Sequence, residues 1–341
     1  MTGVIWFWLV AAMLVAYVVL DGFDIGVGIL HVLLARTEEE RQLTLRSIAP
    51  VWDGNEVWLI AAGGTLYFAF PLLYASAFSG FYLALMIVLW LIILRGLAIE
   101  LRMELQDTVW RAFFDGAFFF SSALLAIFYG VALANVIRGV PLTRDGDFFV
   151  PLWTDWRVGP QPGILDWYTM TAGAVALVAL MVHGALYLAV KTGGDLQQRA
   201  RTAVRRWWVA LAALTVVGLA ASLVARPTVI DNYRSYPVLF AIPIGVVLTS
   251  IGILYFARRN ADGRSFACSC GYLACMLGGA AAALYPRLLP SSRLDGWDIT
   301  IVNAVAGPHT LRVGLLWWGF GISLAILYFA VVYRMFRGKV T

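Results

Sequence analysis

Charged residues are scarce in this chain of 341 residues, where Asp, Glu, Lys and Arg together make up 13%. A soluble globular protein carries about 25% charged residues, which coat its surface. Hydrophobic residues make up 61% of the chain, whereas disordered chains combine low hydrophobicity with high charge. The composition therefore excludes both an ordinary soluble enzyme and a disordered chain.

Cysteine and histidine are also scarce, with three of each. Three cysteines make no disulfide framework, and the Cys-x-Cys-x4-Cys run lacks the further ligands of a tetrahedral zinc site. We expect Cys268, Cys270 and Cys275 to be reduced thiols. The chain has no G-x-x-x-x-G-K-[ST] motif and no G-x-G-x-x-G after a strand, so nucleotide binding is unsupported. The net charge of +5 does not indicate nucleic-acid binding, because the basic residues lie between hydrophobic segments.

Hydrophobic sequence comes in segments of about 20 residues or more, long enough to cross a hydrocarbon layer of ~30 Å. Nothing basic precedes the first segment, so we do not interpret it as a signal peptide. The alternating pattern of a transmembrane β-barrel is absent. We predict an all-α integral membrane protein with one transmembrane domain over residues 1–341. Nine spans are expected, at about 4–33, 54–73, 78–99, 113–136, 167–190, 207–226, 238–257, 266–285 and 312–334.

The distribution of basic residues predicts the orientation. If the N-terminus is outside, 17 Lys and Arg residues, Arg95 and Arg102 among them, fall in cytoplasmic segments and eight fall outside. Cytoplasmic segments carry the excess of Lys and Arg, so we predict an outer N-terminus and a cytoplasmic C-terminus. The connection 137–166, rich in Pro, Trp and Asp, is expected to form an ordered cap over helix ends.

Ionisable residues form one stripe within the first predicted span. On a helix, the run L-D-G-F-D-I-G-V-G-I-L-H at 20–31 places Asp21, Asp24, Gly28 and His31 within about 80° of one another. Charged groups inside a membrane are costly and usually functional. Two carboxyls and an imidazole can pass protons along, which favours a proton relay. The alternative is a buried polar cluster that holds helices together.

Further acids lie near the starts of two predicted spans. Asp53 and Glu56 in P-V-W-D-G-N-E have the spacing of a capping box, and spacing alone favours that role. The same position at the cytoplasmic surface also suits the entrance of a proton relay. Asp115 begins the fourth predicted span, where an acid in the first turn complements the helix dipole.

Histidines and glycines give weaker signals. His183, inside the fifth predicted span, could bind haem, relay protons or form hydrogen bonds in the core. We favour the core, because one histidine cannot by itself supply a His–His or His–Met ligand pair. His309 is expected in an outer loop that faces water. Gly22 and Gly26, spaced G-x-x-x-G, and the run A-A-G-G at 61–64 predict close helix contacts.

Five stretches together resemble subunit II of cytochrome bd-type quinol:oxygen oxidases. They are LDGFDIGVGIL (20–30), SIAPVWDGNEVWLIAAGGTLYFAFPLLYASAFSGFYLAL (47–85), YGVALANVIRGVPL (129–142), HGALYLAVKTGGDL (183–196) and YPRLLPSS (285–292). The resemblance runs nearly end to end, and D-G-F-D with W-D-G-N-E is specific.

The resemblance implies a complex of the bacterial cytoplasmic membrane that oxidises quinol, reduces O2 to water and builds a proton gradient without pumping. Each large subunit would have two four-helix bundles plus a peripheral helix. Subunit I would carry two haems b, haem d and the quinol-oxidising loop. This chain would bind no haem, support assembly and bring cytoplasmic protons to the oxygen site. A structural quinone or lipid and a small single-span accessory subunit are further expectations.

The resemblance also implies site residues. The family's proton-path aspartates match Asp21 in D-G-F-D and Asp53 in W-D-G-N-E, with Trp52 beside the latter. Asp24, the second acid of D-G-F-D, is placed in the same path. Further candidates are His31, Glu56 and His183. The resemblance thus favours a proton entrance at Asp53 over a cap.

Two other hypotheses stay open at this point. A stand-alone proton-coupled transporter would account for the stripe in the first span. Transporters often have broken helices in corresponding halves, and no such pair is visible here. Alternatively, the chain is a scaffold whose acids are only structural.

Overall fold

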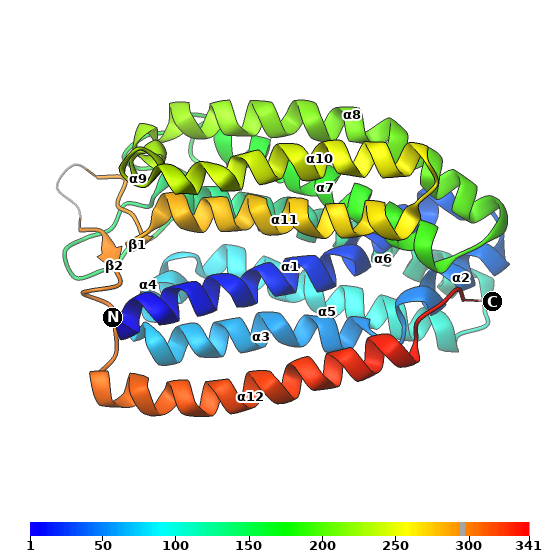
Figure 1. The fold of residues 1–341 in the computed structure, drawn as a ribbon, viewed down its shortest axis with the longest axis horizontal. Helices are drawn as coiled ribbons and strands as arrows, with labels where there is room; N and C mark the ends of the chain where they lie inside the picture. Colours follow the sequence, from blue (N-terminus) through cyan, green and yellow to red (C-terminus); the bar gives the residue numbers. More distant parts are fainter. Residues whose placement is uncertain (294–296, 341) are drawn as a thin grey trace.

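The computed structural model describes residues 1–293 and 297–340, which fold into long helices aligned along one axis (Figure 1). Eight helices in these two ranges are long and apolar enough to cross a membrane. A helix satisfies its own backbone hydrogen bonds, as a hydrocarbon environment requires. The all-helical membrane class is therefore confirmed. The N- and C-termini lie at opposite ends of the molecule.

The nine longest helices follow the predicted spans in order. They are α1 (Thr2–Leu34), α3 (Trp52–Ala69), α5 (Tyr82–Glu104), α6 (Thr108–Arg138), α7 (Trp167–Lys191), α8 (Gly194–Ala225), α10 (Ala241–Arg258), α11 (Asp262–Leu284) and α12 (Pro308–Met335). Among them, α3 is outside the set of eight, because three polar residues lie near its start. Shorter elements are α2 (Glu38–Ile48), α4 (Pro71–Gly80), α9 (Asp231–Ser235), the 3-10 turns η1 (Pro227–Ile230) and η2 (Pro237–Phe240), and strands β1 (Arg287–Leu289) and β2 (Ile299–Thr300).

The long helices form two groups that meet along α1 and α7. In the first group, α1 packs against α3 and α6, and α5 packs against α6. In the second, α7 packs against α8 and α11, and α10 packs against both α8 and α11. The groups are joined where α7 and α11 contact α1 and where α7 contacts α6. α12 lies at the edge of the molecule beside α3 (Figure 1).

Two glycines let α1 and α7 touch through their backbones. A Cβ atom on Gly26 would lie 2.1 Å from the Leu180 carbonyl oxygen, and one on Gly184 would lie 2.3 Å from the backbone of Gly26. Only residues without side chains permit such a crossing. The contact predicted for G-x-x-x-G is confirmed. The prediction for A-A-G-G is wrong at its glycines, because Cβ atoms on Gly63 and Gly64 would meet nothing within 4 Å.

Several boundaries differ from the predicted spans. The second helix ends at Ala69 because Phe70 leaves the helical conformation, and Pro71 then begins α4. Residues 34–53, which lie between the first two predicted spans, contain α2, and Thr37 and Glu40 form a capping box at its start. α8 begins well before the predicted residue 207, so part of the preceding connection is helical.

The connection 137–166 is an ordered cap, as predicted. Arg138 at the end of α6 forms a buried ion pair with Asp166, the residue that caps α7. Asn135 donates a hydrogen bond to the Ile164 carbonyl at 2.9 Å. Phe148 packs where a side chain on Gly80 would otherwise lie. The cap therefore fixes the ends of α6 and α7, next to the small β1–β2 ribbon that the sequence did not predict.

Candidate functional site

Asp21 of α1 is held by a buried arginine. One guanidinium nitrogen, Nη2 of Arg95 on α5, lies 2.8 Å from Asp21 Oδ1 and 2.9 Å from Oε1 of Glu56 on α3. Asp21 and Arg95 are fully buried, and the Glu56 side chain is 16% exposed. Three helices of the first group therefore share one ion cluster, with Glu56 nearest to the surface.

This arrangement corrects the role assigned to Arg95. The sequence prediction counted Arg95 among the cytoplasmic residues that set topology, but the structure buries it inside the helix group. The signal was present in V-L-W-L-I-I-L-R-G-L-A-I, where Arg95 is the lone charge in an apolar run. A charge at such a position requires a partner of opposite sign.

Asp24 lies one turn further along α1 and is held by Asn55 of α3. The Asn55 amide nitrogen donates to Asp24 Oδ2 at 2.7 Å, and its oxygen accepts a hydrogen bond of 2.8 Å from Tyr333 of α12. Asp24 and Asn55 are both fully buried. We call Asp21, Asp24, Asn55, Glu56 and Arg95 the acidic cluster.

Part of the polar surface of the acidic cluster lacks a partner among the described residues. The unpartnered buried atoms are Asp21 Oδ2, Asp24 Oδ1, and Nε and Nη1 of Arg95. Buried polar atoms are normally bonded to protein or to ordered water, and an unpaired one costs about 1–3 kcal/mol. The arrangement therefore suits internal water molecules, which would connect the two carboxyls.

Asp53 and Trp52 lie at the start of α3. Asp53 is exposed, whereas Trp52 is buried with its ring against Gly96 of α5. The predicted capping box is wrong: Val51 precedes the helix without a side-chain cap, and Glu56 points to Arg95 instead. Residues three apart are neighbours on a helix surface, so exposed Asp53 adjoins half-buried Glu56.

His31, at the other end of the α1 stripe, belongs to a second polar cluster. Its Nε2 lies 2.7 Å from Oδ1 of Asp115 on α6, and its Nδ1 lies 2.5 Å from the Thr44 hydroxyl of α2. Asp115 also accepts hydrogen bonds from Arg102 at 2.6 Å and from Arg41 at 2.7 Å. We call these five residues the His31 cluster.

The first-turn role predicted for Asp115 is therefore wrong. α6 begins at Thr108, with Asp107 as its capping residue, so Asp115 lies two turns inside the helix and is 2% exposed. Glu38, at the start of α2, also accepts hydrogen bonds from Arg102. The hydrogen bonds from Arg102 lower the pKa of the Glu38 carboxyl, against the opposing effect of burial.

His183 is a hydrogen-bonded core residue, as we favoured. Its Nε2 donates to the Val19 carbonyl at 2.9 Å, its Nδ1 lies 2.7 Å from the Ser269 hydroxyl, and its ring stacks on Phe266 at 4.9 Å. Both nitrogens of His31 are likewise engaged. The two buried histidines therefore do not fit as axial ligands of a haem.

The described residues also form no metal site. No group of three or more His, Cys, Asp or Glu side chains among them is arranged to hold a metal ion. Cys268, Cys270 and Cys275 are free thiols, as expected. Cys268 and Cys275 pack against Gly252 and Gly245 of α10, which indicates a packing role.

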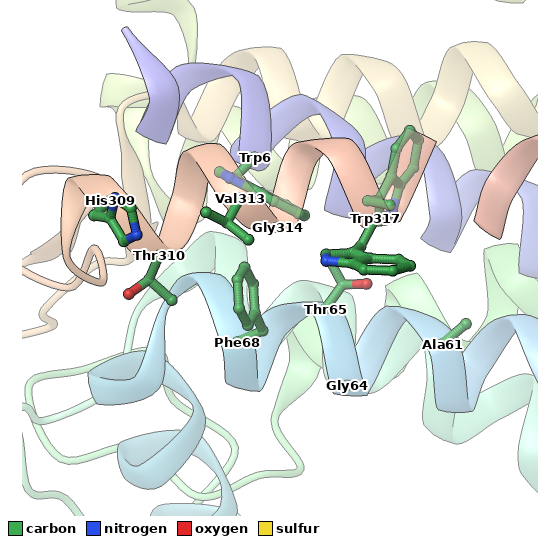
Figure 2. Close-up of a pocket in the computed structure, with 11 residues that line it drawn as sticks. Trp6, Ala61, Gly64, Thr65, Phe68, His309, Thr310, Val313, Gly314 and Trp317 are labelled. Carbon is green, nitrogen blue, oxygen red and sulfur yellow. The ribbon is translucent and has the colours of Figure 1, made fainter. Parts of the chain in front are cut away.

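A groove of about 600 Å³ lies between α3 and α12 (Figure 2). Its lining includes four large aromatic side chains, those of Trp6, Phe68, Trp317 and Trp318. His309, at the end where α12 begins, is exposed. It lies in the first turn of α12 instead of the expected outer loop. The groove suits an apolar chain with a small polar group at one end.

The fold has a counterpart among solved structures. A chain in the structure of the bd oxidase from Geobacillus thermodenitrificans matches with a TM-score of 0.76 at 16% sequence identity, over 98% of both chains. The sequence family described as cytochrome bd terminal oxidase subunit II matches residues 2–336. The chain belongs to this family.

Individual relatives agree with this membership of the subunit II family. Cytochrome bd-I ubiquinol oxidase subunit 2 of Escherichia coli K12 is 34% identical over 373 residues, covering 99% of this chain and 94% of that protein. Cytochrome bd ubiquinol oxidase subunit 2 of Bacillus subtilis 168 is 31% identical, covering 99% and 96%. This bd oxidase subunit II is therefore a multi-pass membrane component of a respiratory quinol oxidase, and it has a subunit I as partner.

Proposed function

We propose that this subunit II conducts cytoplasmic protons toward the oxygen-reducing site of its complex and supports assembly of the haem-bearing subunit I. The observation that carries the proposal is the acidic cluster, which is buried at Asp21 and reaches the surface through Glu56 beside Asp53. Such a gradient of exposure is what a proton path needs.

The charge balance of the acidic cluster supports proton storage. Three carboxyls, those of Asp21, Asp24 and Glu56, lie near the single guanidinium of Arg95, so full ionisation would leave an excess of two negative charges. Burying an uncompensated charge costs several kcal/mol. The cluster is therefore suited to take up a proton from Asp53 and release it when the charge distribution nearby changes.

For the membrane arrangement we propose nine spans in a single transmembrane domain, with the N-terminus outside and the C-terminus cytoplasmic. α3 would be the ninth span, since it lies alongside α1 throughout (Figure 1). The two helix groups described above support two four-helix bundles, with α12 as the peripheral helix. The basic residues support the orientation, and the oxidase family supports a bacterial cytoplasmic membrane.

The chemistry of the complex would lie on the partner. We propose two haems b, haem d and the quinol-oxidising loop on subunit I, with quinol and O2 as substrates and no proton pumping. The engaged histidines of this chain agree with that division. A small single-span accessory subunit completes the proposal. The aromatic groove beside α12 is where a structural quinone or lipid would lie.

The test is the quinol oxidase turnover of the purified complex carrying Asp21→Asn or Asp53→Asn. Each variant is expected to lower turnover roughly tenfold or more, the scale of a lost proton-transfer group, while the haem spectrum stays normal. Asp107→Asn is the matched control, because Asp107 is an exposed acid near the cytoplasmic start of a helix and Asn caps equally well.

The outcomes of this test distinguish a proton-conducting role from a structural role for Asp21 and Asp53. Unchanged turnover in an intact complex with either variant would refute the proton path through that residue. Loss of the whole complex with Asn at position 21 or 53, but not at Asp107, would favour a scaffold.

A further inference from the structure

α6 places two serines side by side in the membrane, and only one has a hydrogen-bond partner. The Ser121 hydroxyl donates to the Ala117 carbonyl of its own helix at 2.7 Å. The Ser122 hydroxyl is fully buried and has no partner among the described residues. A serine inside a helix normally donates back to a carbonyl one turn earlier. The unpaired Ser122 hydroxyl therefore costs free energy of folding, and this hydroxyl points away from the carbonyls of its own helix.

Ser122 points at the α1 stripe. A Cβ atom on Gly28 would lie 2.1 Å from Ser122 Oγ and 2.8 Å from the Phe118 ring. The missing side chain at Gly28 is thus what lets the hydroxyl reach the α1 backbone. Gly28 lies between the two ionisable ends of the stripe, about 6 Å along the axis from Asp24 and about 4.5 Å from His31.

The α1–α6 contact is antiparallel, so the polar groups of the two helices align in order. His31 pairs with Asp115, Gly28 adjoins Phe118 and Ser122, and Asp24 comes one turn later. Asp24 Oδ1 is itself an unpartnered buried acceptor. A proton that crosses from His31 to Ser122, or from Ser122 to Asp24, would need bridging water. The Phe118 ring, 5.6 Å from the His31 ring, is the apolar group in between.

Both ring nitrogens of His31 face an oxygen atom. Its Nε2 faces Asp115, which two arginines keep ionised, so Nε2 carries a proton. Thr44 donates its hydroxyl hydrogen to the Arg41 carbonyl at 2.7 Å, which leaves its oxygen to accept a proton from Nδ1. When Nδ1 is bare, the Thr44 hydroxyl turns to donate to it. One hydroxyl rotation therefore serves both the cationic and the neutral ring.

Four charged groups lie around the His31 ring. Asp115 of α6 is negative, Arg102 of α5 and Arg41 of α2 are positive, and Glu38 of α2 binds Arg102 on the cytoplasmic side. With His31 cationic, the buried ring has a carboxylate at 2.7 Å. Arg41 and Glu38, whose side chains are 35% and 38% exposed, are the members of this set that contact solvent.

We propose that the α1–α6 contact is a second cytoplasmic proton entrance, in which His31 takes up a proton and the Ser122 hydroxyl relays it past Phe118 to Asp24. In the step, the imidazolium gives up one proton to water. Ser122 accepts a proton on its oxygen while releasing its own, and Asp24 Oδ1 becomes protonated. The neutral imidazole is then reloaded from the cytoplasm. This entrance rests on the proposed function, because it ends at the same acidic cluster.

Substitutions at Ser122 in the purified complex test the relay. Ser122→Ala is expected to lower quinol oxidase turnover roughly tenfold and to raise its solvent deuterium isotope effect, because proton transfer becomes limiting. Ser122→Gly is expected to recover part of the turnover, since the freed space admits another water. A structural role predicts the reverse order, because glycine costs a helix about 1 kcal/mol relative to alanine. Ser121→Ala is the matched control and should behave as wild type.

A second pair of variants tests the loading residue. His31→Gln is expected to lower turnover by a similar factor, whereas His183→Gln, which alters a buried histidine without a carboxylate partner, should change turnover less than twofold. Equal effects of the two histidine variants in intact complexes would overturn the role of His31, and wild-type behaviour of Ser122→Ala would overturn the relay.

Asp24→Asn distinguishes the entrance from the function on which it rests. If Asp24→Asn lowers turnover while the Ser122 and His31 variants do not, the second entrance is refuted and the proton path stands. If Asp24→Asn does not change turnover in an intact complex, Asp24 is not part of the proton path, and the second entrance is refuted as well. Should Ser122→Ala prevent assembly while Ser122→Gly does not, packing accounts for Ser122 and the relay is refuted.

Discussion

Replacing Arg95 by glutamine should destabilise subunit II more than any other single change to the acidic cluster. One nitrogen of Arg95 lies 2.8 Å from Asp21 and 2.9 Å from Glu56. At an effective dielectric constant of about 20, each pair attracts by about 6 kcal/mol before the cost of desolvation. Removing one partner of a buried ion pair costs about 3–5 kcal/mol, because the remaining charge stays buried and unpaired. We expect the upper half of that range.

The measurement is the half-life of the purified oxidase at a fixed elevated temperature, with the intact complex quantified by gel filtration over time. Arg95→Gln should shorten the half-life roughly tenfold or more, because unfolding relieves the unpaired charge. Adding Asp21→Asn to Arg95→Gln should restore most of the loss, since the buried carboxylate that paired with Arg95 is then neutral and Glu56 is partly solvated. If the single and double variants decay at the same rate, charge pairing does not hold this cluster and the reasoning is refuted.

Two further predictions concern the helix contacts. Gly26→Ala should destabilise the fold by about 1–3 kcal/mol or more and lower the amount of intact complex, because the new methyl group would clash with backbone atoms that cannot move. Gly63→Ala, where the methyl group would meet nothing within 4 Å, should have neither effect. The lowered pKa of Glu38 implies stability that is present above its unfolded value of about 4.3 and lost as the pH falls through the folded value. Proteolysis within residues 34–53 should therefore increase in acid. Glu38→Gln should remove this pH dependence, whereas Glu39→Gln should not.

The sequence predicted the class of fold well because hydrophobic length is a strong signal in a membrane protein. The stripe of Asp21, Asp24 and His31 is also visible from helical periodicity, and all three side chains are fully buried. The partners of these residues were not predicted. Arg95 and Asp115 come from other helices, and which helices meet depends on packing that periodicity does not encode.

Local patterns failed where tertiary contacts supplied a stronger interaction. Asp53 and Glu56 match the spacing of a capping box, but Glu56 gains more by binding Arg95 inside the helix group than by binding a backbone amide. Asp115 matches a first-turn acid only if the helix starts near 113. Asp107 caps it earlier and moves Asp115 inside. Positive-inside counting misassigned Arg95 because it weighs each charge without asking where its counter-ion lies.

The place of α12 has a consequence for how the chain matures. Its buried side chain among the described residues is Leu311 near the start, whose carbonyl accepts from Trp6, and Tyr333 near its end donates to Asn55. α12 is synthesised after the other long helices, so Asn55 gains this partner only once α12 has been made. A ribosome product truncated before α12 would leave the Asn55 oxygen unpaired beside Asp24. Completion of the acidic cluster therefore depends on α12, although every charged member of the cluster comes from α1, α3 and α5.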